Sequence, residues 1–189
     1  MDDSAGASDA RTDLIRGAIR VIADKGLRGL TLRAAAAEAG LTHGLIVHYF
    51  GTRDSLIEAA MQFAVDQSLA GTLASAEGGA PVLGDHVVEV GVDADGTLAF
   101  QREILNEALR RPELRTLAVR MYEKYEAAVR DQLGALGVTD PDAVVLVGAA
   151  MDGLARRQMD LGDVAATERA VTLMRSLVGL LRASDASAH

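Results

Sequence analysis

The feature that most constrains the fold is a pair of short helical segments separated by a tight turn. Thr31 is a suitable N-cap for a helix over residues 32–39, and Thr42 is a suitable N-cap for a second helix that ends near Phe50. Between them, Gly40 can adopt the positive φ angle that a sharp turn needs. The first helix also carries small side chains that let the two axes approach closely, at Ala35, Ala36 and Ala39. Two short helices joined in this way predict a helix-turn-helix.

Helical periodicity also dominates the rest of the chain, and no segment shows the alternating pattern of a β-strand. An amphipathic helix precedes the pair, from about Arg11 to Lys25, and Gly26 stops it. A fourth helix follows the N-cap Thr52, and residues 71–84, rich in Gly, Ala and Ser, predict a loop. Further helices are predicted over residues 82–92, 98–111, 112–136, 141–161 and 167–182. The chain is therefore expected to be all-α, with about nine helices.

Charge is distributed unevenly along the chain. The 189 residues carry a net charge of −8, yet residues 11–60 contain seven Arg or Lys against five Asp or Glu, whereas residues 61–189 contain twelve against nineteen. A basic block on an acidic chain fits a DNA-reading head attached to a body that phosphate would repel. Because 49% of the residues are apolar, the chain can also bury a sizeable core.

Several kinds of chemical site are absent from the sequence. It contains no cysteine, and no two of its four histidines have metal-ligand spacing alongside carboxylates. The run Asp93-Ala94-Asp95-Gly96 is similar to the start of a calcium loop, but its glycine comes too early and a third acidic ligand is missing. Neither a phosphate-binding glycine motif nor a Gly-x-Ser-x-Gly elbow occurs. We therefore expect no catalytic residue, no metal and no cofactor, and we do not expect an enzyme.

A more specific pattern occupies residues 40–56. Gly40-Leu41-Thr42-His43-Gly44 is followed by Ile46-Val47-His48-Tyr49-Phe50-Gly51-Thr52-Arg53-Asp54-Ser55-Leu56. This segment resembles the signature of the TetR family of transcription regulators, which has a glycine turn, a short recognition helix, a His/Tyr/Phe cluster and a basic residue soon after the Phe. The resemblance covers about residues 11–60. The rest of the chain resembles the family only in the number and length of its helices.

The resemblance implies a DNA-binding head of three helices followed by a helical body. Residues 1–10 are expected to be a disordered acidic arm, residues 11–56 the helix-turn-helix domain, residues 57–183 a ligand-binding and dimerisation domain, and residues 184–189 a disordered tail. The second helix of the motif would enter the major groove with its amino end facing the bases. The implied DNA contacts are Thr42, His43 and Gly44 at bases or adjacent phosphates, and Thr31, Arg33, His48, Tyr49 and Arg53 at the DNA backbone.

Three positions differ from the usual family pattern. Arg53 stands where the family usually has Lys, and its guanidinium can bind a phosphate through two hydrogen bonds. Leu45 replaces a commonly polar residue, and Val47 replaces a commonly aromatic one. Since Val47 can touch a thymine methyl but cannot bond a phosphate, fewer backbone contacts or a different operator are implied.

Dimerisation is expected of the carboxyl-terminal helices. Residues 143–151 are apolar around the whole helix circumference, so both faces should be buried, and the last helix is similarly wide in its apolar surface. Burial in a monomer core is one explanation. The resemblance implies another, in which the last two helices, about 140–161 and 167–182, pair with those of a second copy in a four-helix bundle.

The resemblance further implies that the remaining helices enclose a pocket for an unknown small-molecule effector. Because aromatic residues make up only 3% of the chain and Trp is absent, this pocket would be aliphatic and rich in Met. Each candidate lining residue can also be explained as core or solvated surface. The candidates are Phe100, Glu103, Asn106, Glu107, Met121, Tyr122, Tyr125, Met151, Asp152 and Arg156.

The resulting hypothesis is a homodimeric repressor that binds a palindromic operator in double-stranded DNA and is released by a small-molecule effector. The alternatives are a helical adaptor that binds protein without DNA affinity, and an activator or effector-independent regulator of the same fold. With neither a long apolar run nor a secretion signal, we expect no membrane partner and a cytoplasmic location, at the nucleoid when bound to DNA. The sequence specifies neither the effector nor the operator.

Overall fold

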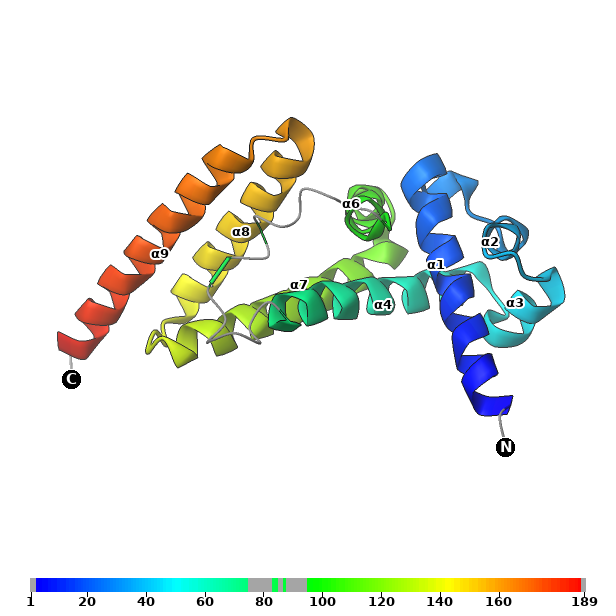
Figure 1. Ribbon diagram of the computed structural model, residues 1–189, viewed down its shortest axis with the longest axis horizontal. Helices are drawn as coiled ribbons and strands as arrows, with labels where there is room; N and C mark the ends of the chain where they lie inside the picture. Colours follow the sequence, from blue (N-terminus) through cyan, green and yellow to red (C-terminus); the bar gives the residue numbers. More distant parts are fainter. Residues whose placement is uncertain (1–2, 75–82, 85–86, 88–94, 188–189) are drawn as a thin grey trace. The chain divides into compact units, whose positions relative to one another are not determined.

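The computed structural model describes residues 3–74, 83–84, 87 and 95–187. The regular structure in these residues is helical (Figure 1), which confirms the expected all-α class. The helices are α1 (Asp3–Gly29), α2 (Leu32–Glu38), α3 (His43–Phe50), α4 (Arg53–Ala74), α6 (Thr97–Ala108), α7 (Pro112–Ala135), α8 (Pro141–Leu161) and α9 (Val164–Ser187). The helix predicted over residues 82–92 lies almost wholly outside the described residues. Within the part that is described, no helix is both long and apolar enough to cross a membrane.

The starts of α2, α3 and α8 follow local capping signals. The hydroxyls of Thr31 and Thr42 accept backbone N–H groups three residues further on, at 3.0 and 3.3 Å. Asp140 caps α8 in a similar way at 2.8 Å, and Pro141 occupies the first helical position. All three starts agree with the prediction, because a capping side chain acts on backbone within a few residues of itself.

Two helices extend into segments that were predicted to lack helix. α1 begins at Asp3 instead of near Arg11, so most of the arm predicted to be disordered is helical. The arm contains several alanines, which favour helix without needing an apolar face. α4 continues through Gly71 to Ala74, into the predicted loop, since one glycine inside a helix costs only about 1 kcal/mol relative to alanine.

α9 is also longer than predicted, at both ends. It begins at Val164 instead of near residue 167, and it ends at Ser187, within the tail predicted to be disordered. Its early start has a local cause, because the Asp163 carboxylate accepts the N–H of Ala166 at 3.0 Å. This cap is a signal that the sequence contains and that the prediction overlooked.

The chain forms two compact units. The first comprises residues 1–68 and 93–121, and the second comprises residues 69–92 and 122–189, so that α4 and α7 contribute to both. The first unit therefore includes α6, which contacts α1, in addition to the helices of the predicted head. The functional boundary placed after residue 56 stays a prediction.

α1 is the central helix of the first unit. It contacts α2 and α3 as well as α6, and it is therefore buried around most of its circumference. At the approach of α1 to α2, a Cβ atom on Gly17 would lie 2.6 Å from the carbonyl oxygen of Ala35. The buried apolar residues of α1 are those of the predicted face, Leu14, Ala18, Val21 and Ile22, together with Ile15 and Ile19 beside them.

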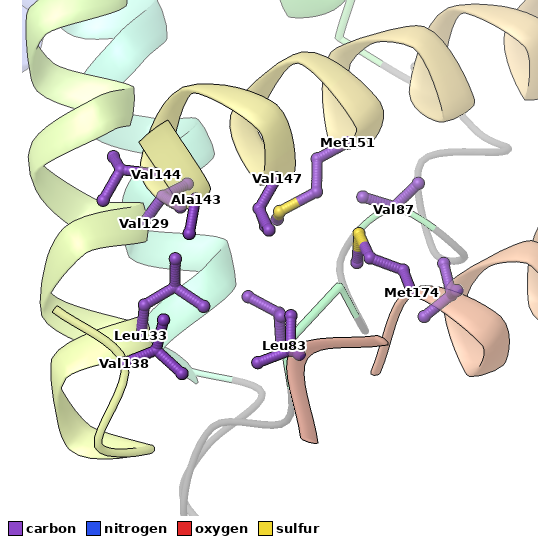
Figure 2. Packing of buried hydrophobic residues seen from close by; sticks show 12 residues of the cluster. Leu83, Val87, Val129, Leu133, Val138, Ala143, Val144, Val147, Met151 and Met174 are labelled. Carbon is purple, nitrogen blue, oxygen red and sulfur yellow. The ribbon is translucent and has the colours of Figure 1, made fainter. Parts of the chain in front are cut away.

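The second unit has an aliphatic core to which α7, α8 and α9 all contribute (Figure 2). Residues 83–84 are attached to α9, because Nε of Arg175 donates to the carbonyl of Leu83 at 2.7 Å. A Cβ on Gly84 would lie only 3.0 Å from the Val171 side chain, so the backbone packs directly on α9. The core consists of Leu83, Val87, Val129, Leu133, Val138, Ala143, Val144, Val147, Met151, Val171, Met174 and Val178.

The close approach of α1 to α2 makes a specific prediction about Gly17. Gly17→Ala should lower the free energy of unfolding by about 1–3 kcal/mol, because the added methyl group meets a backbone carbonyl that cannot move aside. Gly44→Ala is the matched control, since a Cβ there meets no atom within 4 Å and alanine favours helix. Urea unfolding of both variants tests this, and equal stability of the two would contradict the packing described.

Candidate nucleic-acid interface

The helix-turn-helix is present with the predicted turn. Gly40 adopts a φ of 68°, and the next residue returns its N–H to the carbonyl of Ala36 at 2.9 Å. From α3, Ile46 and Phe50 are buried, and these two side chains attach the helix to the rest of the first unit. This arrangement leaves the opposite face of α3 open to solvent, as a helix that enters a DNA groove requires.

Most of the predicted DNA-contacting residues lie at the protein surface. The structure exposes Thr31 and Arg33 on α2 and its cap, and it leaves Tyr49 and Arg53 half-buried. On α3 and its cap, the exposed members of the set are Thr42, His43, Gly44 and His48. Their placement is compatible with contact to DNA, and the contacts themselves stay predictions.

Arg11 adds a positive charge that the prediction missed. Its guanidinium carbon lies 5.4 Å from the centre of the Phe50 ring, a cation–π geometry that places the charge at the carboxyl end of α3. The neighbouring rings of His48 and Tyr49 meet edge to face at 5.4 Å. Arg11 is exposed, and the sequence marked it as a possible DNA contact only by placing it in the basic block of residues 11–60. It is therefore a further candidate for contact with a DNA phosphate.

Arg53 has a structural role that the family resemblance did not imply. Its Nε donates to the carbonyl of Leu30 at 2.9 Å, and its Nη2 donates to the carbonyl of Leu27 at 2.6 Å. These bonds attach the start of α4 to the last turn of α1 and to Leu30, which follows it. The side chain therefore supports the helix-turn-helix from behind, and its contact with a phosphate stays a prediction.

Glu103 is likewise used by the protein itself. α1 breaks at Gly26, where φ is 69°, and the N–H of the following Leu27 is donated to the Glu103 carboxylate at 2.9 Å. A predicted ligand residue of α6 is thus a hydrogen-bond partner of the end of α1. Leu27 is fully buried, and its peptide groups are bound from two sides, by Glu103 through the N–H and by Arg53 through the carbonyl.

A second contact joins α1 to the end of α2. Nε of Arg20 lies 2.9 Å from Oε1 of Glu38, and the same guanidinium donates to the Glu38 carbonyl at 3.3 Å. Both side chains are about two-fifths exposed, so the pair adds little to stability. Its value is geometric, because it holds the carboxyl end of α2 at a defined place on α1.

The predicted ligand residues are divided between the two units. Phe100, Met121 and Met151 are buried, whereas Asn106 and Asp152 are exposed. Phe100, Glu103, Asn106 and Met121 belong to the first unit, and Tyr122, Tyr125, Met151 and Asp152 belong to the second. Met151 is part of the aliphatic core of the second unit. A ligand pocket built from these residues therefore stays a prediction.

Glu107 is buried and ion-paired. A hydrogen bond from Arg110, and the charges of Arg110, Arg111 and Arg28, hold the pKa of its carboxyl below the ordinary value, although burial acts in the opposite direction. The distance from its carboxylate to Nε of Arg111 is 2.8 Å. Glu107 thus closes the carboxyl end of α6, a structural use that accounts for its burial without a ligand.

The phenol of Tyr122, which is 43% exposed, is affected by charged side chains of α8. Partial burial and the nearby negative charge of Asp152 raise the pKa of its phenol, and Arg156 partly offsets this. The Asp152 carboxylate in turn lies 3.7 Å from the Arg156 guanidinium. The contact of Tyr122 with a ligand stays a prediction.

The first unit also has an open hollow with a volume of about 450 Å³, and none of the ten candidate residues lines it. The described residues also contain no group of three acidic or histidine side chains that is suited to a metal ion. The hollow is lined by Arg20, Val21, Ala23, Asp24 and Lys25 of α1, by Glu38 of α2, and by Asp95, Gly96 and Ala99.

Two family models match the sequence. The one described as "Bacterial regulatory proteins, tetR family" matches residues 14–60, and the one described as "Tetracyclin repressor-like, C-terminal domain" matches residues 74–181. The first contains the whole helix-turn-helix. The second covers more than half of the chain, which includes the region where the sequence alone resembled the family only in its helices.

The chain is also similar in sequence to individual transcription regulators. The chain is 42% identical over 52 residues to the transcriptional regulator BetI of Burkholderia thailandensis, which is 28% of this chain and 27% of that protein. It is 37% identical over 57 residues to the transcriptional repressor KstR2 of Rhodococcus jostii, or 30% of this chain and 28% of that protein. The match therefore spans only about a quarter of the length of these relatives.

Several solved structures are similar over nearly the whole chain. The multidrug binding protein EbrR, solved with malachite green, has 29% sequence identity and a TM-score of 0.63, and the similarity covers 88% of this chain and 96% of that one. The likeness thus extends through the carboxyl-terminal helices.

The two bonds of Arg53 lead to a prediction that separates its structural role from phosphate binding. Arg53→Ala should lower the free energy of unfolding by about 1–3 kcal/mol, because it leaves two buried carbonyls without their charged donor. It should also reduce the salt slope of DNA binding by about one unit if Arg53 contacts a phosphate. Arg53→Lys keeps the charge but not the forked geometry, so it should restore the salt slope without restoring stability.

Arg33→Ala is the matched control, because Arg33 is exposed on α2 and its loss should leave thermal stability unchanged. Melting curves and a salt titration of DNA binding measure the two effects. If Arg53→Ala had the same melting temperature as the wild-type protein, the bonds of Arg53 to the two carbonyls would not contribute to stability.

Proposed function

Because the chain belongs to the TetR family of bacterial regulatory proteins, and is therefore a DNA-binding transcription regulator, we propose that it acts as a homodimeric repressor. Each helix-turn-helix reads one half of a palindromic operator, and a small molecule bound to the body releases the dimer from DNA. The observation that carries this proposal is an open recognition helix on a chain that also exposes a large apolar face. Membership of a family of DNA-binding regulators argues against the alternative of a protein-binding adaptor without DNA affinity.

The apolar face of α8 and α9 supports the homodimer. Leu146 is 67% exposed on α8, and Leu173 and Leu180 are 61% and 68% exposed on α9. Val145, next to Leu146, and Leu177, one turn from Leu173, are also exposed, so the two antiparallel helices (Figure 1) present leucines in the amino-terminal half of α8 and from the middle of α9 toward its carboxyl end. Neighbouring exposed apolar side chains mark interaction sites, and a second copy would cover these leucines in a four-helix bundle.

Dimerisation also matches what the recognition helix requires. A single helix-turn-helix contacts only one half-site, whereas a two-fold dimer contacts two that lie about one helical turn or slightly more apart. A dimer bound across a promoter excludes polymerase without any further contact surface. The chain is similar to KstR2, which is named as a repressor, and this similarity favours repression rather than activation.

The bonds at Leu27 support control by a ligand. Glu103 on α6 holds the N–H of Leu27, and this residue lies next to the turn that leads into α2. A ligand that shifts α6 would alter this bond and with it the orientation of the helix-turn-helix. In free-energy terms, the ligand must bind better to the arrangement that does not fit DNA.

Organic cations are the ligand class to test first. EbrR was solved with malachite green and with proflavin. In this chain, residues 61–189 carry nineteen acids against twelve bases, and the negative charge of Asp152 acts on the Tyr122 phenol. These features favour a positively charged, largely apolar effector.

The first experiment selects the operator. The purified protein is incubated with a random duplex library, and bound DNA is sequenced after a salt titration. A palindrome with half-sites about one helical turn apart is the expected result. Malachite green or proflavin should then weaken operator binding in a fluorescence anisotropy assay. Failure of every duplex to be enriched, or an operator affinity that no small molecule changes, would contradict the repressor mechanism.

The exposed leucines give a prediction about assembly. Leu177→Asp should convert the dimer to a monomer at micromolar concentration, because a charge in the centre of an apolar interface is costly to bury. Leu109→Asp is the matched control, since Leu109 is 86% exposed at the end of α6 and lies outside this face. Analytical ultracentrifugation distinguishes the two, and a dimeric Leu177→Asp variant would place the interface elsewhere.

The Glu103 bond gives a prediction about ligand response. Glu103→Ala leaves the buried N–H of Leu27 without its acceptor, so it should lower the free energy of unfolding by about 1–3 kcal/mol. It should also reduce the effect of the bound dye on operator affinity, while dye binding itself is retained. Glu103→Gln keeps an acceptor oxygen and should show a smaller change in both. A stable Glu103→Ala variant with the full dye response would remove this residue from the mechanism.

A further inference from the structure

The outward face of α3 is small and lacks the side chains that usually read bases. The exposed residues of this helix are His43, Gly44, Val47 and His48, which lie on one side because they are spaced by one helical turn. The sequence of α3, HGLIVHYF, contains no Arg, Lys, Asn or Gln. The helix therefore cannot make the bidentate contacts by which Arg or Lys reads guanine and Asn or Gln reads adenine.

Val47 is the apolar side chain on this face. It is 42% exposed, whereas Ile46 before it is fully buried and holds the helix in place. Val47 is left in water on a recognition surface, and covering such an apolar group lowers the free energy of the complex. The apolar group that the major groove offers is the C5 methyl of thymine. Val47 and a thymine methyl are thus complementary in chemistry.

Gly44 stands beside Val47, and the protein itself gives no reason for a glycine there. Gly44 is absent from the glycines of positive φ, and a Cβ added to it would meet no atom within 4 Å. Inside a helix, glycine is destabilising relative to alanine. The missing side chain therefore leaves room on the outside, where the first turn of α3 can approach the edges of the bases closely.

We propose that Val47 reads a thymine methyl in each operator half-site, and that Gly44 provides the close approach that this contact needs. The proposal deepens the operator-binding function above and rests on it. It specifies an A·T pair beneath the middle of α3, recognised through its methyl group and not through hydrogen bonds. His43 and His48 flank this contact and supply the polar interactions on either side.

The test uses the selected operator with deoxyuridine in place of the thymine at this position, which removes the methyl group and leaves base pairing unchanged. Affinity should fall about fourfold for one half-site and about fifteenfold for both, the loss expected for one buried methyl group in each. Val47→Ala should weaken binding to the thymine operator to a similar degree. In that variant, deoxyuridine should have no further effect, because its partner is already missing.

Deoxyuridine at a thymine outside the footprint of α3 is the control for the DNA, and it should leave affinity unchanged. Gly44→Ala is the control for the approach of the helix. It should retain or exceed wild-type thermal stability and yet bind the operator about tenfold more weakly, the order of one lost base contact.

Three results overturn the inference while leaving the regulator function intact. They are a selected half-site without thymine beneath α3, an affinity that deoxyuridine does not change, and a Val47→Ala variant as sensitive to deoxyuridine as the wild-type protein. Failure to enrich any duplex would instead contradict the proposed function, so the two failures are distinguishable.

Discussion

The orientation of the helix-turn-helix depends on how the residue Leu27 is held. α1 breaks at Gly26, and the peptide groups of Leu27 are bound on one side by the Glu103 carboxylate of α6 and on the other by the Arg53 guanidinium of α4. Both partners are charged groups, and hydrogen bonds from charged groups to backbone are stronger than hydrogen bonds between neutral groups. Side chains from two other helices therefore fix the turn into α2, and the orientation of α2 and α3 depends on that turn.

α3 has a buried face that attaches it to the first unit and an exposed face that we propose reads DNA. Ile46 and Phe50 are buried and attach the helix to the first unit, and Arg11 packs against the ring of Phe50. The side chains on the opposite face have no comparable structural duty, and Gly44 contributes only an absence of bulk. Because the two sets are separate, residues that face DNA can change between related regulators while the helix keeps its place. The fold can thus persist while the DNA sequence that is read changes.

Local signals explain why much of the fold was predictable from the sequence. The caps Thr31, Thr42 and Asp140, and the turn at Gly40, act on backbone a few residues away, so their positions followed directly from residue type. The roles of Glu103 and Arg53 were not predictable in this way. The donor to Glu103 lies 76 residues away in the chain, and the two acceptors of Arg53 lie 23 and 26 residues away. All of these partners are backbone groups, so the identity of the partner residue gives no sign of the bond. The same limit applies to the ligand candidates, since Phe100 and Met151 satisfy the pattern of a pocket and of a core equally well.

In the homodimeric repressor that we propose, the exposed leucines of α8 and α9 have a consequence for control in the cell. A regulator that binds DNA only after pairing through this face has an active concentration that varies with the square of its monomer concentration, as long as most copies are unpaired. Halving the number of copies, for instance at cell division, would then reduce the active form about fourfold by mass action. Repression would respond steeply to the abundance of the protein itself, and a gene under such control would switch over a narrow range of regulator expression.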